Sequence, residues 1–556
     1  MAECSAPKRA ANLMVQGTMS SAGKSLLVAA LCRIFREDGW RVAPFKSQNM
    51  ALNSGVTNDG LEMGRAQMMQ AEAAGIAPDV RMNPVLLKPT GERTSQVVVN
   101  GIPAATMDAR TYFAHRRSLV PQILAAYDSL AAENDIIVIE GAGSPAEINL
   151  RDGDIVNMGL AELVDAPVLL LGDIDRGGVF AALYGTVALI TETERTRIKG
   201  LVINKFRGDV SLLQDGLERI TALTNIPVLG VIPWIERLLV DDEDSLSARL
   251  LGDEKPNAIL HVCVVRLPLI SNFTDVQAFS RLSFVQVSFF SDVDEYELAC
   301  AEYGEPDLIV LPGTKNTVRA LDWLRARHLD RLVVRKARAG MPTVGICGGF
   351  QLLGATLHDG GGHEDGSAQP DIPALGLLPL ETTFTAEKAR ARVHARLAPL
   401  EGFFAPLSGC VVRGYELHHG LTRVAAGSEL LSCNTPEAAR GVEIEPQPVV
   451  TDAALSARRH AAFADSAETL RQHSPDTARA LAYAAGNVLG TYVHGFFDSE
   501  EMVRALVALL CAQKGAAVPP HEPCYERTRE AEYARLAATV RASLDMDAIY
   551  RIVFAR

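Results

Sequence analysis

The stretch Pro342-Thr-Val-Gly-Ile-Cys347-Gly-Gly-Phe-Gln-Leu-Leu-Gly354 predicts a strand, a sharp turn and a helix in immediate succession. Residues 343–346 have the apolar character of a short buried strand, and helix-compatible apolar spacing begins at Phe350. Cys347 lies between them among glycines, in the cysteine form of the G-x-S-x-G turn, which exposes a nucleophile at a strand end. Glycines let the chain turn without a Cβ clash, and a helix start favours the thiolate. Cys347 is therefore a candidate nucleophile, although a lone cysteine is more often structural.

A second candidate site lies near the N-terminus. It is the glycine-rich segment Gly17-Thr18-Met-Ser-Ser-Ala-Gly23-Lys24-Ser25. A short apolar run precedes it and an amphipathic helix pattern follows, which is the context of a phosphate-binding loop. Its backbone N–H groups would cradle phosphate oxygens, Lys24 would reach the β- and γ-phosphates of ATP, and the Ser25 hydroxyl would bind Mg²⁺. Five residues instead of the usual four separate the two glycines, so a chance glycine-rich turn is the alternative.

Strand-like apolar runs alternate with helical patterns through both halves of the chain. They cover residues 41–45, 135–139, 167–171, 200–203, 227–232, 258–265, 307–311 and 487–493. This alternation predicts an α/β protein with two doubly wound domains, each built on a parallel sheet. A polar shift near residue 255 places an ATP-binding domain at residues 1–252 and a second domain at 257–556. Residues 434–484 have little strand character and look like an insertion.

Carboxylates near the expected strand ends are candidate metal ligands, because functional loops of doubly wound sheets follow those ends. Glu140 comes directly after a strand and would face the phosphate loop as an Mg²⁺ ligand, and Glu62 could be a second one. Both could instead be solvated surface charges. Asp173 and Asp175 could bind metal or substrate, or cap the next helix.

Cys347 needs a general base, and His494 is the main candidate. It ends a strand in the same domain and is followed by Gly495, so its ring could project into a site at the strand ends. His418 and His419 are the rival candidates, since a lone histidine is often structural.

An oxyanion hole would be needed beside the nucleophile. The N–H of Gly348, the residue after Cys347, is one expected donor. The other would come from the turn at Gly313 and Thr314, which also follows a strand.

Composition excludes several classes of protein. The net charge of −13 over 556 residues, without a Lys/Arg-rich run, argues against nucleic-acid binding. Nine cysteines, none in C-x-x-C spacing, indicate neither a disulfide scaffold nor a zinc site. No run approaches the roughly 18 apolar residues of a membrane span, and no signal-peptide pattern opens the chain. We expect a soluble cytoplasmic protein without a membrane partner; the oligomeric state stays unknown.

These motifs resemble those of known families. Gly-Ile-Cys347-Gly-Gly-Phe-Gln and the later Tyr-Val-His494-Gly resemble class I glutamine amidotransferases. The N-terminal half, with its lengthened phosphate loop, resembles ATP-dependent carboxylate activators of the dethiobiotin synthetase type. Longer motifs, including Pro44-Phe-Lys-Ser-Gln-Asn-Met-Ala-Leu-Asn53, Met82-Asn-Pro-Val-Leu-Leu-Lys-Pro89 and Ile270-Ser-Asn-Phe-Thr-Asp275, resemble the cobyric acid synthase family. That resemblance covers nearly the whole chain outside residues 434–484.

The resemblance implies stepwise amidation of the b, d, e and g carboxylates of a corrinoid, adenosylcobyrinic acid a,c-diamide. ATP and Mg²⁺ would convert each carboxylate to an acyl phosphate, and ammonia released from glutamine at Cys347 would displace the phosphate. By the same resemblance, Glu62 and Glu140 fall at metal positions, Asn204 at an adenine-contacting position, and Lys46 near the transferred phosphate.

One residue departs from the class I pattern, which usually has His-x-Glu. Phe496 stands at the glutamate position here, so His494 is either oriented by another group, such as a backbone carbonyl, or works without a carboxylate. Three alternative functions stay open: cobyrinic acid a,c-diamide synthase, a regulatory P-loop ATPase, and a scaffold with a degenerate amidotransferase domain.

Overall fold

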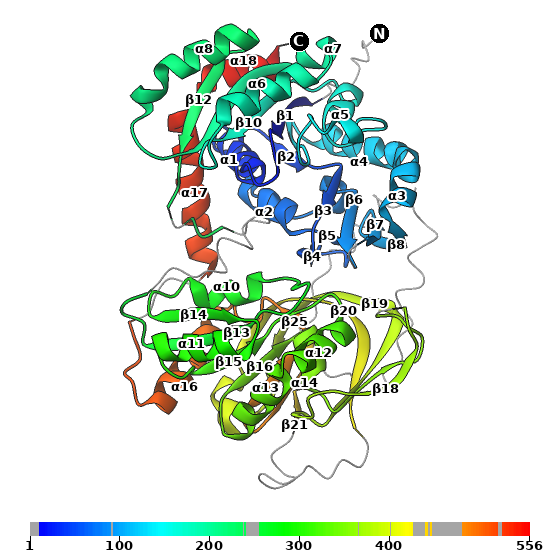
Figure 1. Cartoon of the computed structure of the whole chain (residues 1–556), viewed down its shortest axis with the longest axis vertical. Helices are drawn as coiled ribbons and strands as arrows, with labels where there is room; N and C mark the ends of the chain where they lie inside the picture. The colour runs from blue at the N-terminus through cyan, green and yellow to red at the C-terminus, as the bar shows by residue number, and fades with distance from the viewer. Residues whose placement is uncertain are drawn as a thin grey trace, which may run out of the picture. The chain divides into compact units, whose positions relative to one another are not determined.

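The computed structural model describes residues 10–90, 93–236, 238–240, 255–364, 366–400, 402–425, 440–442, 445–446, 481–520 and 525–555 (Figure 1). The chain forms two compact units. The first contains Met1–Leu251 together with Pro523–Arg556, and the second contains Gly252–Glu522. Most of the expected insertion at 434–484 and of the polar stretch before residue 255 lies outside the described residues.

A six-stranded parallel sheet forms the centre of the first unit. Its strands, in spatial order, are β12 (Val228–Pro233), β11 (Ile198–Phe206), β10 (Val168–Asp173), β1 (Ala11–Gly17), β9 (Ile136–Glu140) and β2 (Val42–Phe45). All seven residues of β1 are buried, because helices cover both faces of a parallel sheet. The sheet order and the alternation of strands with helices confirm the predicted α/β fold.

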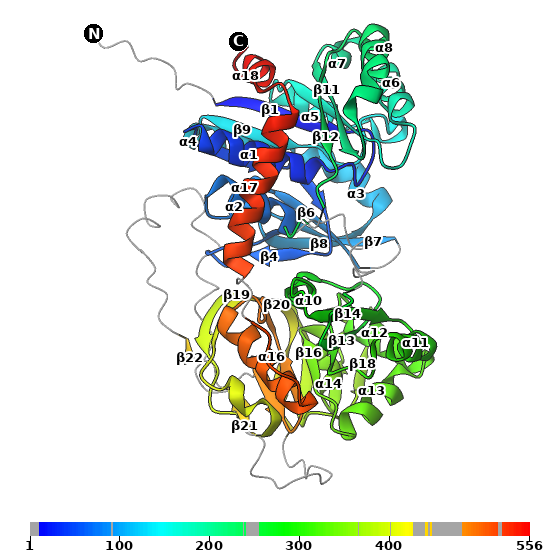
Figure 2. The ribbon, with the colours of Figure 1, turned by 90° about the vertical axis from the view of Figure 1, so that its left-hand side faces the viewer.

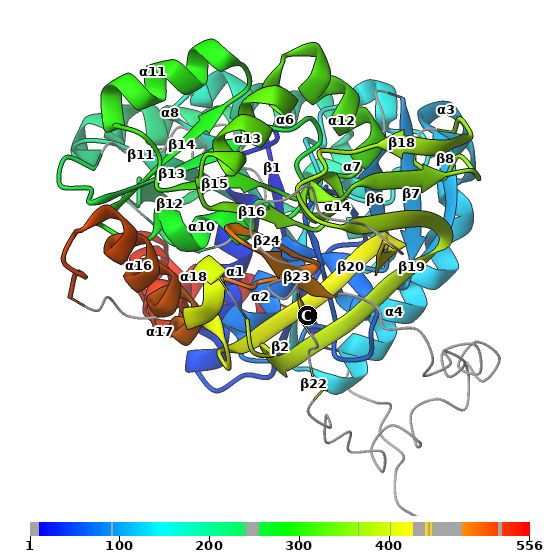
Figure 3. The same cartoon turned by 90° about the horizontal axis from the view of Figure 1, so that it is seen from below.

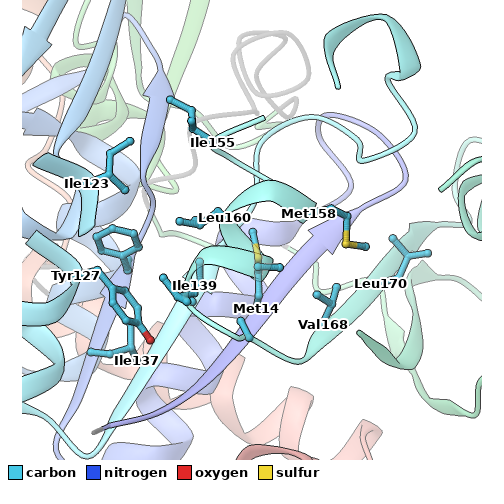
Figure 4. Close-up of a cluster of buried hydrophobic side chains, with 14 of the residues drawn as sticks. Met14, Ile123, Tyr127, Ile137, Ile139, Ile155, Met158, Leu160, Val168 and Leu170 are labelled. Atoms are coloured by element: carbon cyan, nitrogen blue, oxygen red, sulfur yellow. The ribbon is translucent and has the colours of Figure 1, made fainter. Parts of the chain in front are cut away.

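The two faces of this sheet have separate hydrophobic cores. One face packs against α4 (Val120–Glu133), α5 (Met158–Leu163), α6 (Val179–Leu189) and α8 (Gln214–Thr224). In that core, Met14 and Ile139 of the sheet lie beneath Tyr127 and Leu160 (Figure 4). The opposite face packs against α1 (Lys24–Glu37), α2 (Arg65–Ala74), α17 (Tyr525–Ser543) and α18 (Met546–Phe554).

Smaller elements complete the first unit. One further sheet has the order β3 (Gln48–Met50), β6 (Val85–Pro89), β7 (Thr94–Val99) and β8 (Ile102–Asp108), and β4 (Ser54–Val56) pairs with β5 (Glu62–Gly64). The short helices are α3 (Ala109–His115) and α7 (Glu192–Arg195).

The second unit is built on a seven-stranded sheet. Its order is β14 (Val285–Phe290), β13 (Leu260–Val265), β15 (Leu308–Leu311), β16 (Thr343–Ile346), β24 (Val488–Thr491), β23 (Ala482–Ala485) and β21 (Arg440–Val442). The first five strands are parallel, β23 pairs antiparallel with β24, and β21 pairs antiparallel with β23. Its helices are α10 (Thr274–Ser280), α11 (Val293–Tyr303), α12 (Thr317–Ala326), α13 (Leu329–Arg338), α14 (Gly348–Leu353) and α16 (Glu500–Lys514).

A second sheet of this unit follows a different plan from the predicted parallel one. It has the order β18 (Gln369–Pro373), β17 (Thr356–Asp359), β19 (Leu380–Arg396), β20 (Val411–Val424) and β25 (Val493–His494), with β22 (Glu445–Pro446) beside β19. The long strands β19 and β20 pair antiparallel (Figure 3). Within the described residues, no helix is both long and apolar enough to cross a membrane.

The C-terminal segment departs from the expected division, which placed residues 257–556 in one domain. Residues of α17 belong to the first unit's core, and α17 packs across α1 (Figure 2). Strand β12 approaches the end of α17 so closely that a Cβ on Gly230 would lie 2.0 Å from the Ser543 carbonyl oxygen. Asp38 and Arg541 add an ion pair at 2.9 Å. Apolar side chains of α17 are buried in this core, so the second unit is inserted into the first.

Truncating α17 should therefore destabilise the first unit. Leu536 is buried in its core, and we expect Leu536→Ala to lower the free energy of unfolding by about 2–5 kcal/mol. Leu223→Ala is the matched control, because Leu223 is 66% exposed on α8 and should change stability by less than about 0.5 kcal/mol. Denaturant unfolding of the full chain measures both. Equal, small effects would contradict the packing of α17 in this core.

Candidate functional site

The predicted phosphate loop connects β1 to α1 in the first unit. Gly23 has φ 96°, in the left-handed region that favours glycine, and a Cβ there would lie 2.2 Å from Asn204 Nδ2. A Cβ on Gly17 would lie 3.1 Å from Lys24 Cδ, so both glycines are needed for the loop to close around this lysine. Lys24 Nζ donates to the carbonyl oxygens of Met19 at 3.0 Å and Gly143 at 3.2 Å.

Thr18, at the start of the loop, has different surroundings for its backbone N–H and its hydroxyl. Its N–H already donates to the Leu171 carbonyl oxygen at 2.9 Å, so this N–H is not available to a phosphate. Its hydroxyl Oγ1 is buried and has no hydrogen-bond partner among the described residues. A buried hydroxyl without a partner is costly unless a ligand satisfies it, so the loop fits an oxygen-rich anion.

Two residues at the end of β11 form hydrogen bonds to the phosphate loop. Asn204 Nδ2 donates to the Ala22 carbonyl oxygen at 2.9 Å, and Lys205 Nζ donates to Ser21 at 2.5 Å. Lys205 also forms a 2.8 Å ion pair with buried Asp173, so this carboxylate supports the loop. Asp175 lies 3.0 Å from Arg207, and α6 begins after Gly178, so neither aspartate caps that helix.

Glu140, at the end of β9, is buried beside the loop. Its Oε1 accepts from Ser25 Oγ at 2.9 Å and from Lys46 Nζ at 2.8 Å. Its Oε2 accepts from Gln70 Nε2 at 2.5 Å and from Gln67 Nε2 at 3.3 Å. Burial alone would raise the pKa of Glu140, but the charge and hydrogen bond of Lys46, the hydrogen bond of Gln70 and the charge of Lys24 lower it below its ordinary value. Glu140 is therefore anionic and could serve as a hard oxygen ligand.

Glu62 has a different environment. It lies on β5, where its Oε1 accepts from Ser54 Oγ at 2.8 Å and from Lys88 Nζ at 2.6 Å. Across the described part of the chain, no three Asp, Glu, His or Cys side chains form a group that could hold a metal ion. A hydroxyl and one carboxylate, Ser25 and Glu140, suit a divalent cation whose remaining ligands are waters, or phosphate oxygens when a nucleotide is bound, which is how Mg²⁺ commonly binds in nucleotide sites.

The predicted nucleophile turn lies in the second unit, between β16 and α14. Cys347 has φ 53° and ψ −109°, a strained backbone conformation for a residue other than glycine. A Cβ on Gly345 would lie 2.5 Å from the Gly349 carbonyl oxygen, and one on Gly349 would lie 2.0 Å from that of Leu311. The glycines on both sides therefore permit the close packing that holds Cys347 in place.

His494 is buried at the end of β25, and a carboxylate holds it. Its Nδ1 lies 2.7 Å from Asp275 Oδ2, and Asp275 Oδ1 accepts from the N–H of Gly495 at 2.7 Å. Its Nε2 has no hydrogen-bond partner within the described ranges. Burial alone would lower the pKa of His494, but the charges of Asp275 and Cys347 raise it above its ordinary value. Asp275 therefore orients the imidazole and favours its charged form.

The two turns expected to form an oxyanion hole lie together. A Cβ on Gly348 would lie 3.0 Å from the backbone nitrogen of Thr314, and one on Gly313 would lie 3.4 Å from His494 Cε1. The Gly313 carbonyl oxygen accepts from the Ser271 N–H at 2.9 Å. The peptide between Gly313 and Thr314 is trans, so its carbonyl oxygen and its N–H point in opposite directions. The Thr314 N–H therefore points away from Ser271.

The rival histidines lie on β20. His418 is buried and stacks on Tyr492 with ring centroids 3.5 Å apart, and its Nε2 lies 3.4 Å from Glu416. His419 Nδ1 is 3.3 Å from the Thr385 carbonyl oxygen. His494 is electrostatically coupled to Cys347, and the Leu417 carbonyl oxygen is 3.8 Å from Cys347 Sγ.

Asp275 is the functional residue that the sequence analysis did not assign. It lies on α10, in the motif Ile270-Ser-Asn-Phe-Thr-Asp275, whose single carboxylate was the available signal. Phe496, at the usual glutamate position, is fully buried, and its ring centroid lies 5.2 Å from that of Phe497. Asp275, a carboxylate from a distant segment of the chain, therefore orients His494.

Comparisons with known proteins show the family to which each half of the chain is similar. The family described as the CobQ/CobB/MinD/ParA nucleotide binding domain matches residues 13–246, and that of the CobB/CobQ-like glutamine amidotransferase domain matches residues 261–502. The cobyric acid synthase of Ruminiclostridium cellulolyticum is 47% identical over 542 residues, 97% of this chain and 96% of the relative. That of Lachnoclostridium phytofermentans is 46% identical over 98% of this chain and 99% of its own length. A solved structure described as a glutamine amidotransferase covers 45% of this chain and 98% of its own length at 14% identity, with a TM-score of only 0.27.

Asp275→Asn tests the orientation of His494. The substitution keeps the shape of the side chain but removes its charge, so burial should dominate and the pKa of His494 should fall. Less imidazolium then supports the thiolate, and the pH range in which iodoacetamide alkylates Cys347 should move upward. Hydrolysis of glutamine should fall by about 10²–10⁴-fold, as when a catalytic histidine loses its orienting carboxylate. Asp322→Asn, in the exposed part of α12, is the control. An unchanged alkylation profile would contradict the role of Asp275.

Proposed function

We propose a function for this chain on two grounds: it belongs to the cobyric acid synthase family, and its two units carry candidate sites for the two halves of one reaction. The chain is an ATP-dependent, glutamine-hydrolysing amide ligase of cobalamin biosynthesis. Its substrates are glutamine, ATP and the corrinoid adenosylcobyrinic acid a,c-diamide, which it amidates at the b, d, e and g carboxylates. The observation that carries the proposal is that one chain holds both a phosphate loop beside Glu140 and a Cys347–His494 pair.

The first unit would activate the carboxylate. A carboxylate is a poor acyl donor, and transfer of the γ-phosphoryl group gives it a good leaving group. Lys24 would neutralise charge on the transferring phosphate, Lys46 would contact the same group, and Asn204 would contact the adenine. Ser25 and Glu140, with Glu62 as a further candidate, would hold Mg²⁺, which neutralises phosphate charge when bound.

The second unit would release ammonia from glutamine. Cys347 would attack the side-chain amide carbon while His494 gives a proton to the leaving ammonia. The N–H groups of Gly348 and Thr314, with Gly313 shaping the turn, would stabilise the oxyanion. Mass spectrometry of the corrinoid product tests the overall function, because each amidation shifts its mass by a fixed small step. A product with two new amides on cobyrinic acid would instead indicate an a,c-diamide synthase. A cytoplasmic location stays a prediction.

Cys347→Ala separates the two half-reactions. Amidation with glutamine should fall by roughly 10⁴-fold or more, because the covalent nucleophile is gone. Amidation with concentrated ammonium, at a pH that supplies free NH₃, should persist because the first unit is untouched. Lys24→Ala is the reciprocal variant and should lose amidation with both nitrogen sources. Loss of both activities in folded Cys347→Ala would place the cysteine outside glutamine hydrolysis.

Glu140→Gln tests the Mg²⁺ ligand. The amide keeps the shape of the carboxylate but removes a hard anionic oxygen, so half-saturation should require a higher Mg²⁺ concentration. Ammonium-dependent amidation measured against Mg²⁺ concentration gives this value, and glutamine hydrolysis in the same preparation serves as the folding control. An identical Mg²⁺ curve in the variant would exclude Glu140 as a ligand.

A further inference from the structure

We propose that Lys46 is an exchangeable counter-ion: it neutralises Glu140 while no divalent cation is bound and moves to the transferred phosphate when one binds. The inference rests on the proposed function, which puts ATP and Mg²⁺ at the phosphate loop. It adds an order of events, since Lys46 reaches its catalytic position only after the metal has replaced it.

The two oxygens of Glu140 have different roles. Oε2 is held by two amides, Gln70 at 2.5 Å and Gln67 at 3.3 Å. Oε1 accepts from Ser25 Oγ at 2.9 Å and from Lys46 Nζ at 2.8 Å. Ser25 Oγ and Glu140 Oε1 are the two oxygens suited to Mg²⁺, and Lys46 contacts Oε1 directly. Lys46 stands where a cation is needed.

The low dielectric of the site makes the exchange necessary. Side chains of Glu140 and Lys46 are 1% and 8% exposed, so a carboxylate here requires a positive partner. A second cation on the same oxygen would lie within a few ångströms of the ammonium, and the two would repel strongly with little water between them. The amides on Oε2 carry no charge, so they can keep the carboxylate in place while its cation changes.

Lys46 is chemically suited to move. Its ammonium is a compact charge on a flexible four-carbon stem, whereas an arginine fork would be committed to a fixed geometry. Lys46 follows β2, which pairs in parallel with β9. Its side chain therefore starts at the carboxyl ends of the strands, where the phosphate loop also begins. Phosphate oxygens are the nearest new source of negative charge once ATP is bound.

Direct metal binding tests the exchange without relying on turnover. We would titrate the full chain with Mn²⁺ in the absence of nucleotide and follow free Mn²⁺ by electron paramagnetic resonance. Lys46→Met should bind Mn²⁺ at least about tenfold more tightly than the unmodified chain, because the competing ammonium is gone. Lys46→Arg keeps the charge and should not. Lys514→Met is the matched control, because Lys514 pairs with Asp307 at 2.8 Å in the second unit.

Two further variants keep the test decisive. Lys46→Met with Glu140→Gln should lose the tighter binding, which locates the metal at Glu140. Lys46→Gln retains a hydrogen-bond donor without charge and replaces Lys46→Met if that protein does not fold. In either folded variant, Mn²⁺ should also raise the unfolding temperature more than it does in the unmodified chain.

An affinity for Mn²⁺ that is unchanged in folded Lys46→Met and Lys46→Gln would overturn the exchange. In that outcome, corrinoid amidation by the unmodified chain would show that the proposed function stands and that Lys46 is a fixed partner. Failure of the unmodified chain to amidate any corrinoid with ATP and ammonium would instead reject the proposed function.

Discussion

The buried carboxylate of Glu140 needs positive charge and hydrogen-bond donors around it, and much of the first unit is arranged to supply them. Its partners are Ser25 at the start of α1, Lys46 after β2, and Gln67 and Gln70 on α2. Removing any one partner would leave part of a charge unsatisfied in a dry site, which is costly. This requirement joins a helix start, a strand end and a second helix around one group that would contact ATP.

The second unit also buries a charged group that needs a partner of opposite charge, but there the central group is a cation. Here the buried cation is the imidazolium of His494, and the carboxylate of Asp275 comes to it from α10. Asp275 uses its second oxygen to hold the N–H of Gly495, so the histidine and its strand end are fixed together. In both units, residues beyond the ends of strands bring together polar groups that are distant in the sequence.

Short-range patterns predicted the parts of each site that a continuous segment builds. The loop from Gly17 to Ser25 and the turn at Cys347 each contain their own glycines, strand and helix start, so local sequence was sufficient. Asp275 was missed because it lies 219 residues from His494, and only the folded sheet brings the two together. The position of α17 was missed because neighbouring segments normally pack together, whereas this helix returns to the first unit to bury its apolar side chains. The long β19–β20 pair was also missed, since its strands have mixed exposure with no continuous apolar run.

The return of α17 bears on how one chain can carry two reactions. An appended domain would have one connection, but an inserted unit has two, one on each side of residues 252–522. The second connection ends in α17, whose Tyr533 hydroxyl lies 3.1 Å from Glu72 on α2, the helix that also carries Gln67 and Gln70. Arg529 of α17 pairs with the same Glu72 at 2.9 Å. These two contacts fix α17 to α2, the helix whose Gln67 and Gln70 hold Oε2 of Glu140.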